Sequence, residues 1–128
     1  MQGLRPAGVK QPISFEVRSG EILGIAGLLG SGRSELLRAI FGADGCEGGT
    51  IHVDGVQLKC GDPRRAVHAG LGLLTEDRKR LGLLLELTIR ENASIADLDE
   101  ISRFTLVDRK QERGIVDKYL GGLRLPGL

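Results

Sequence analysis

Aromatic side chains are scarce in this sequence, which has no tryptophan, one tyrosine and three phenylalanines among 128 residues. An excess of charge is missing as well, because 18 lysines and arginines stand against 17 aspartates and glutamates, a formal net charge of +1. No overall field draws the chain to nucleic acid, and we expect no nucleic-acid partner. No apolar run has the length of a membrane span, and the first residues lack a signal-peptide pattern. We therefore expect a protein in the cytoplasm, or on the cytoplasmic side of something larger.

Cysteine is also rare, with only Cys46 and Cys60. The two residues are not a C-x-x-C pair, and their separation is not that of a metal site. Disulfides are uncommon in the reducing cytoplasm. We therefore expect both cysteines to be reduced structural thiols.

The apolar segments of the first half of the chain predict strands. Residues 13–18 alternate apolar and polar side chains, the pattern of a half-buried strand, and Ser19-Gly20 follows as a turn. Residues 22–26 and 71–75 are more uniformly apolar, which is typical of strands buried on both faces of a sheet. With 41% hydrophobic residues, the chain has enough apolar material for one small domain.

A helix and a hairpin are predicted next. Leu36, Leu37, Ile40 and Phe41 fall on one face of a helix, which Gly42 ends. The glycine-rich residues 42–49 read as a flexible link. Two short alternating strands then flank Asp54-Gly55, a strong signal for a β-hairpin.

Capping residues mark the later helices. Asp62-Pro63 opens one helix, which Gly70 closes. Residues 76–82 form a charged loop, and Thr88 to Glu91 is a capping box. Residues 108–111 resemble a weaker box. The expected buried face of the last helix consists of Ile115, Val116, Tyr119, Leu120 and Leu123.

The glycine-rich segment 27–34 reads GLLGSGRS, which is the phosphate-binding pattern G-x-x-x-x-G-K-[ST] with Arg33 in place of lysine. In such a loop, successive backbone N–H groups and the N-terminus of the following helix surround phosphate oxygens. Both features depend on backbone shape and survive a change from lysine to arginine. Ser34 keeps the hydroxyl that can bind Mg²⁺.

Arg33 is the altered part of this pattern. Arginine retains the positive charge and can pair bidentately with phosphate, but its planar fork is wider than an ammonium group. We expect nucleotide affinity to be kept and γ-phosphate chemistry to be impaired. The alternative is an ordinary glycine-rich turn. The apolar strand predicted before the loop and the amphipathic helix predicted after it favour a phosphate-binding loop.

Beyond this loop, the sequence resembles the nucleotide-binding subunits of ABC transporters. The resemblance covers about residues 7–98 and is carried by SFEVRSGEILGIAGLLGSGRSELLRAIFGA, GTIHVDG and AGLGLLTEDRKRLGLLLELTIRENASI. It is nearest to the second cassette of the tandem-cassette subunits that power monosaccharide importers of the ribose, xylose and galactose type. Two features shared with that group are Gly32-Arg33-Ser34 and the run EDRKR at residues 76–80.

This resemblance implies an α/β P-loop NTPase fold and the N-terminal part of an ABC ATP-binding cassette. Residues 1–87 would hold the antiparallel β-subdomain and a RecA-like strand, phosphate loop and helix. Residues 88–128 would begin the α-helical subdomain.

The resemblance further implies ATP and Mg²⁺ as ligands. The expected nucleotide-binding residues are Gly27, Leu28, Leu29, Gly30, Ser31, Gly32, Arg33, Ser34 and Glu35. Ser34 and Glu76 are the expected Mg²⁺ ligands. Glu76 stands where most cassettes have the glutamine of the Q-loop, and its extra negative charge suits a regulatory or weakly hydrolytic site.

Several parts of an active cassette are missing from the sequence. No aromatic residue lies in GLRPAGVKQP, so adenine would have only Val9 or the aliphatic stems of longer side chains to lie against, and we expect a lower affinity for the base. No L-S-G-G-x signature, catalytic glutamate strand or switch histidine is found; we expect His52 and His68 to be plain surface residues. No catalytic set is complete. We leave open whether the protein is an enzyme: the full-length protein would be a sugar-transporting ATPase, whereas we expect the isolated chain to be inactive.

The implied partners are a membrane permease, contacted through residues 76–82, and a second cassette. The implied location is peripheral, on the cytoplasmic face of the cell membrane. Open apolar faces at residues 22–26 and 71–75 lead us to expect that the isolated chain self-associates. The competing interpretation is a non-hydrolysing docking module with a relic phosphate loop. A GTPase or kinase is disfavoured because no N-K-x-D motif is present.

Overall fold

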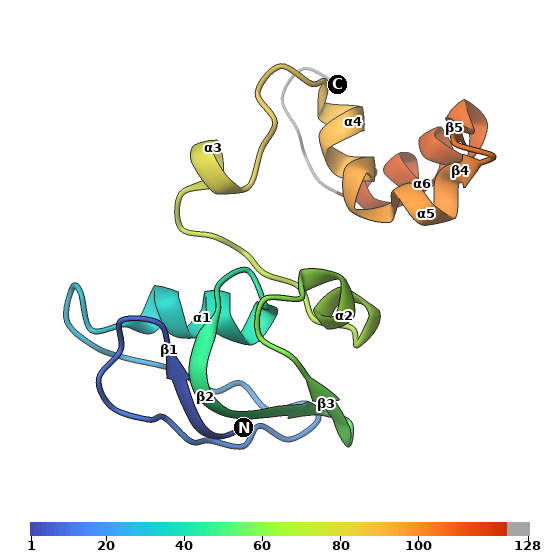
Figure 1. The fold of residues 1–128 in the computed structure, drawn as a ribbon. Helices are drawn as coiled ribbons and strands as arrows, with labels where there is room; N and C mark the ends of the chain where they lie inside the picture. Colours follow the sequence, from blue (N-terminus) through green and yellow to red (C-terminus); the bar gives the residue numbers. More distant parts are fainter. Residues whose placement is uncertain (123–128) are drawn as a thin grey trace. The chain divides into compact units, whose positions relative to one another are not determined.

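The computed structural model describes residues 1–122 (Figure 1). The chain divides into two compact units, Met1–Leu74 and Thr75–Leu128. Helices and antiparallel strands are both present, in agreement with the predicted α/β class. None of the helices within residues 1–122 combines the length and apolar character needed to cross a membrane. Leu123 of the predicted last helical face lies outside the described residues.

The first unit is built on a three-stranded antiparallel sheet in the order β1-β2-β3. Its strands are β1 (Gln2–Pro6), β2 (Cys46–Val53) and β3 (Val56–Leu58). β2 and β3 are the predicted hairpin, and both turn residues, Asp54 and Gly55, have positive φ angles of 48° and 80°. This is the backbone that an Asp-Gly hairpin turn requires, so this prediction is confirmed. The flexible link predicted at residues 42–49 is shorter than expected, because residues 46–49 already belong to β2.

A bulge in β1 brings its central leucine into the core. Gln2 pairs with Thr50 and Arg5 with Gly48, so two residues of β1 lie opposite the single residue Gly49. Leu4 is thereby released from β2, and its backbone exchanges two hydrogen bonds with Ile13, of 2.8 and 2.9 Å. Its side chain is completely buried.

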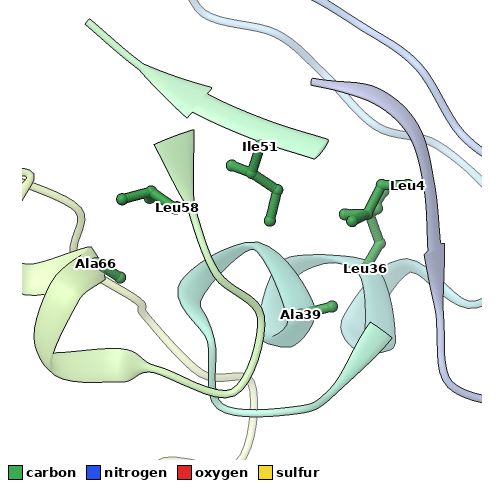
Figure 2. Packing of buried hydrophobic residues seen from close by; sticks show 6 residues of the cluster. All are labelled: Leu4, Leu36, Ala39, Ile51, Leu58 and Ala66. Atoms are coloured by element: carbon green, nitrogen blue, oxygen red, sulfur yellow. The ribbon is translucent and has the colours of Figure 1, made fainter. Parts of the chain in front are cut away.

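Two helices cover one face of this sheet: α1 (Arg33–Phe41) and α2 (Pro63–His68). Figure 2 shows the apolar layer between them and the strands. Its buried members are Leu4, Leu36, Ala39, Ile51, Leu58 and Ala66. The predicted helix after the glycine-rich loop is confirmed, and Gly42 ends it in the left-handed conformation. Asp62 caps α2 as predicted, accepting a hydrogen bond of 3.1 Å from the backbone N–H of Arg65.

The predicted strands at residues 13–18, 22–26 and 71–75 are not formed. An apolar segment becomes a strand only when a neighbour pairs with its backbone over several residues. Within residues 1–122, segment 13–18 has only the bridge from Ile13 to Leu4 and the hydrogen bonds that Phe15 exchanges with Met1, of 2.8 and 3.3 Å. Ile13 and Phe15 still point partly inward, whereas Ile22 is 98% and Leu74 is 99% exposed. The predicted turn is present, since the N–H of Glu21 donates to the carbonyl of Arg18 at 3.0 Å.

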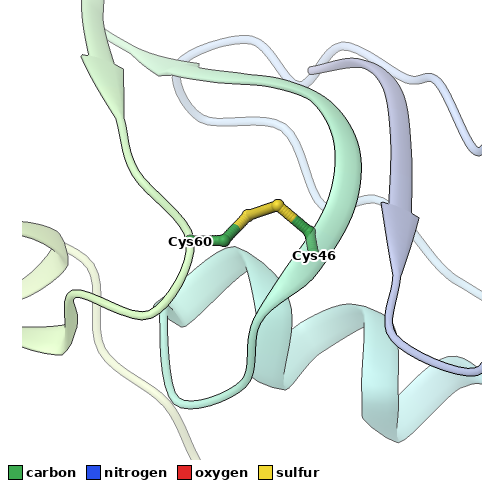
Figure 3. The surroundings of a disulfide bond; sticks show 2 residues. All are labelled: Cys46 and Cys60. Carbon is green, nitrogen blue, oxygen red and sulfur yellow. A yellow bond between two sulfur atoms is a disulfide. The ribbon is translucent and has the colours of Figure 1, made fainter.

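Cys46 and Cys60 form a disulfide, so the expectation of two reduced thiols is wrong (Figure 3). The turn at Asp54-Gly55 folds the chain back, so that the segment after β3 lies beside the start of β2. The two Cα atoms are 5.8 Å apart, a usual separation for a bridged pair. The spacing rules for metal sites do not predict this contact. The hairpin predicted at Asp54-Gly55 lies between the two cysteines and could have indicated that they come close together.

The second unit is mainly helical. Its elements are α3 (Arg78–Leu81), α4 (Ile89–Ser94), the 3₁₀ turn η1 (Ile95–Asp97), α5 (Leu98–Ile101), the two-stranded ribbon β4 (Ser102–Arg103) and β5 (Leu106–Val107), and α6 (Arg109–Leu120). The capping box of α4 is confirmed in both directions between Thr88 and Glu91. Asp108 caps α6 by accepting hydrogen bonds from two backbone N–H groups. The predicted charged loop at 76–82 contains one helical turn, because Asp77 caps α3.

A buried carboxylate joins α4 to α6. Glu112 is 2% exposed and accepts a hydrogen bond of 3.1 Å from the hydroxyl of Ser94. Arg109 lies 3.1 Å from its other oxygen, and Arg90 lies 3.4 Å from that oxygen. Of the predicted apolar face, Val116 is buried but Tyr119 is 59% exposed. The α4–α6 contact is therefore centred on a charge that the apolar pattern did not predict.

Candidate functional site

The segment Gly27 to Ser34 is curled between an extended stretch and α1. The N–H of Ser31 donates to the carbonyl of Leu28 at 3.1 Å, closing a turn. Gly30 and Gly32 have φ angles of 77° and 86°, in the region where side chains with a Cβ are strained. A Cβ placed on Gly27 would collide with the hydroxyl of Ser31, so the two ends of the loop lie close together.

The loop leads directly into the N-terminus of α1. Gly32 is the residue before the helix, and no side chain caps the helix there. The first N–H groups of a helix have no acceptor within the helix, and here no side chain supplies one. Arg33 is half-buried, while Ser34 and Glu35 are exposed. Uncapped amides and the positive end of the helix dipole are the features that attract an anion.

Val9 lies against this loop. A Cβ built on Gly32 would be 3.0 Å from a methyl carbon of Val9, so the glycine allows the valine side chain to approach the backbone. Val9 is half-buried and follows the turn in which its N–H donates to the carbonyl of Pro6 at 3.0 Å. The one residue considered for contact with adenine is therefore beside the loop.

The far end of α1 is anchored by an ion pair. The guanidinium of Arg38 donates two hydrogen bonds of 2.7 Å to the carboxylate of Asp44. These hydrogen bonds hold the pKa of Asp44 below its usual value. The backbone N–H groups of Ala43 and Asp44 also donate to the carbonyl of Arg38. The helix behind the loop is thus fixed at its C-terminus.

The remaining predicted site residue, Glu76, belongs to the second unit, whereas Ser34 belongs to the first. Glu76 is exposed, as are Arg78, Lys79 and Arg80. His52 and His68 are also exposed. Within residues 1–122 no three His, Cys, Asp or Glu residues are grouped as a metal site would require.

One positioning residue was missed from the sequence. The side-chain amide of Asn92 donates to the carbonyls of Leu84, Leu87 and Thr88, and its oxygen accepts a hydrogen bond of 2.8 Å from the N–H of Leu84. Asn92 thereby holds the apolar loop before α4 in place. The position of Asn92, a polar residue within the short helix α4, could have indicated this role from the sequence.

Comparison with known proteins supports the resemblance seen in the sequence. The family model described as "ABC transporter" matches residues 10–127. The chain is 44% identical over its whole length to the ribose import ATP-binding protein RbsA 2 of Streptomyces coelicolor, covering 25% of that protein. It is 48% identical over 90% of its length to RbsA of Yersinia pestis, and 40% identical over 94% to RbsA of Geobacillus kaustophilus.

These alignments cover 23% and 24% of the Yersinia and Geobacillus proteins, so the chain spans about a quarter of the length of the relatives it matches. No solved structure matches it. The family match extends over most of the chain, including the curled loop and both units. The chain therefore belongs to the ABC transporter family.

Proposed function

We propose that this chain is the ATP-binding portion of the energising subunit of a monosaccharide importer, from the second cassette of a tandem pair. The printed names of its relatives, ribose import ATP-binding proteins, support this proposal. The observation that carries it is the loop from Gly27 to Ser34, which is curled, glycine-rich and continuous with an uncapped helix N-terminus. The phosphates would lie against these backbone amides, with Glu35 at the edge of the site.

Arg33 would contribute charge to the bound phosphates, and the exposed hydroxyl of Ser34 would bind Mg²⁺. Bound Mg²⁺ would neutralise part of the triphosphate charge. Glu76 is proposed as a second ligand. Because no complete catalytic set is found in this chain, we propose that it binds ATP and hydrolyses little of it.

Calorimetric titration of the chain with Mg-ATP tests this proposal. We expect one saturable site whose affinity falls about tenfold or more in Arg33→Ala, because a hydrogen bond to a charged group contributes about 1.5–3 kcal/mol. Arg64→Ala is the matched control, since Arg64 is an exposed arginine on α2 in the same unit. No heat of binding in the unmodified chain would remove the nucleotide site and leave the docking module as the better interpretation, whereas equal affinities of the two variants would show that Arg33 does not contact the phosphates.

The same titration can test whether Val9 lies against the adenine base of ATP. Val9→Tyr would place an aromatic ring beside the loop, where stacking on adenine contributes about 1–3 kcal/mol. ATP should then bind more tightly, whereas inorganic triphosphate, which has no base, should not. A gain for both ligands would show that Val9 does not face the base.

We also propose that the loop of residues 76–82 contacts a membrane permease, which would place the protein at the cytoplasmic face of the membrane. Its three basic residues, Arg78, Lys79 and Arg80, are exposed on α3, and the leucines at positions 81, 83, 84, 85 and 87 are exposed by 38% to 68%. A surface with both properties suits a protein partner. The exposed apolar stretches at residues 22–26 and 71–75 also support self-association of the isolated chain.

Charge reversal of Arg78 and Lys79 in the intact transporter tests the docking proposal. We expect sugar uptake to fall severalfold while Mg-ATP binding to the subunit stays unchanged. Reversal of Arg113 and Lys110, exposed on α6, is the control. Unchanged uptake in the first variant would place the permease contact elsewhere.

A further inference from the structure

The disulfide between Cys46 and Cys60 forms part of the wall of a cavity in the first unit. The cavity has a volume of about 530 Å³ and is lined by Gly45, Cys46, Gly49, Ile51, Gln57, Leu58, Lys59, Cys60 and Arg65. This volume is in the range of small-ligand sites. Both cysteines line the cavity and are only partly buried, so we expect a small molecule to approach the disulfide from this side.

The charged residues of this cavity are all positive. Lys59 and Arg65 contribute to the lining, and no aspartate or glutamate among residues 1–122 does. Of the carboxylates near these residues in sequence, Glu47 pairs with Arg5 at 3.2 Å and Asp44 with Arg38 at 2.7 Å, whereas Asp62 accepts a 3.1 Å hydrogen bond from the backbone N–H of Arg65 and keeps its negative charge. The two cations of the lining outweigh this single carboxylate, so the cavity attracts anions to the disulfide.

We propose that Cys46 and Cys60 form a redox-exchange site for small anionic thiols, which Lys59 and Arg65 draw to the disulfide. An anionic thiol with free carboxylates, such as glutathione, has the required chemistry. This site is separate from the proposed nucleotide site, and the inference does not depend on ATP binding.

The exchange proceeds by two displacements. The thiolate of the first small thiol attacks one cysteine sulfur, a mixed disulfide forms, and the other cysteine leaves with the electron pair and takes up a proton. A second small thiol then attacks the sulfur of the bound molecule. The products are two cysteine thiols and one small-molecule disulfide, so two small thiols are oxidised and the protein disulfide is reduced. Oxidation of the pair by the small disulfide is the reverse reaction.

The test measures the rate at which the 128-residue chain is reduced by glutathione, by neutral 2-mercaptoethanol and by cationic cysteamine. Samples are quenched with an alkylating reagent and the alkylated fraction is measured by mass spectrometry. In Lys59→Gln/Arg65→Gln we expect the glutathione rate to fall about three- to tenfold relative to the unmodified chain, with the mercaptoethanol rate unchanged. Comparing each thiol with itself across variants removes differences in thiol reactivity.

Lys79→Gln/Arg80→Gln, which removes two exposed charges from the second unit, is the matched control and should leave all three rates unchanged. Salt dependence of the unmodified chain provides a second measurement that needs no variant. Added salt should slow reduction by glutathione and should not slow reduction by cysteamine. Equal glutathione rates in the two double variants, or complete alkylation of both cysteines before any reductant is added, would overturn the proposal.

Discussion

Glu112→Ala is expected to loosen the contact between α4 and α6, at a cost of about 1–3 kcal/mol. Glu112 is the buried charge between α4 and α6, and its side chain is 3% exposed in the ion pairs with Arg90 and Arg109. The Nε atom of Arg90 is itself buried and has no hydrogen-bond partner within the described residues. Removal of the carboxylate would leave the partly exposed guanidinium groups of Arg90 and Arg109 without their counter-charge, and Ser94 with only its 3.4 Å hydrogen bond to the carbonyl of Glu91.

Hydrogen exchange of the α4 and α6 amides measures this loss directly. Protection of these amides should fall about fivefold or more, because each 1.4 kcal/mol corresponds to a factor of ten in the opening equilibrium. The matched control is Asp117→Ala on the same helix, where the side chain is exposed and the change should stay within about 0.5 kcal/mol. If both variants exchange alike, the buried carboxylate does not hold these helices together.

Gly49→Ala is expected to disrupt the sheet of the first unit, whereas Gly48→Ala one residue earlier should be tolerated. Gly49 has a φ of 90°, and a Cβ there would lie 2.5 Å from Cα of Leu4 and would collide with the carbonyl oxygen of Gly3. These are backbone atoms that no rotamer change can move. The bulge that buries Leu4 depends on this close approach, so we expect a loss of about 3 kcal/mol or more.

Gly48 is a control that differs by one position. Its backbone has no positive φ, and a Cβ placed on it meets no atom within 4 Å. Alanine there should change the free energy of unfolding by less than about 1 kcal/mol in either direction. Urea denaturation of both variants, followed by circular dichroism, measures the difference. Equal midpoints for the two variants would contradict the bulge described above.

The parts of the fold that were predicted from the sequence depend on neighbouring residues. The hairpin at Asp54-Gly55 and the caps at Asp62, Thr88 and Asp108 each need only a few adjacent positions, and all four were confirmed. Strands need a partner from elsewhere. The apolar pattern of residues 22–26 and 71–75 indicated the faces of a strand but could not supply its neighbour, so these predictions were wrong for this chain.

In the candidate site, too, the features set by adjacent residues agree with the sequence-based prediction, whereas features that depend on distant residues were missed. The curled loop, its two left-handed glycines and the helix that follows are consistent with the motif read from the sequence, while nucleotide binding stays a prediction. The burial of Glu112 was missed because the predicted buried face of the last helix was chosen from apolar residues alone. Its position one turn before Val116, on the buried side of α6, was the signal that it lies inside. The disulfide was missed because pairing across a hairpin is not visible in cysteine spacing alone.

The most direct test of the phosphate-binding loop is an NMR titration of the ¹⁵N-labelled chain with Mg-ATP, in which backbone amide shifts are followed residue by residue. The amides of Gly27 to Glu35 should shift together and saturate at one equivalent, because they are the proposed phosphate donors. ADP should shift the same amides, and sodium sulfate at equal ionic strength should move them less. If the loop amides do not move, or if saturating shifts appear only outside residues 27–35, the loop does not hold the nucleotide.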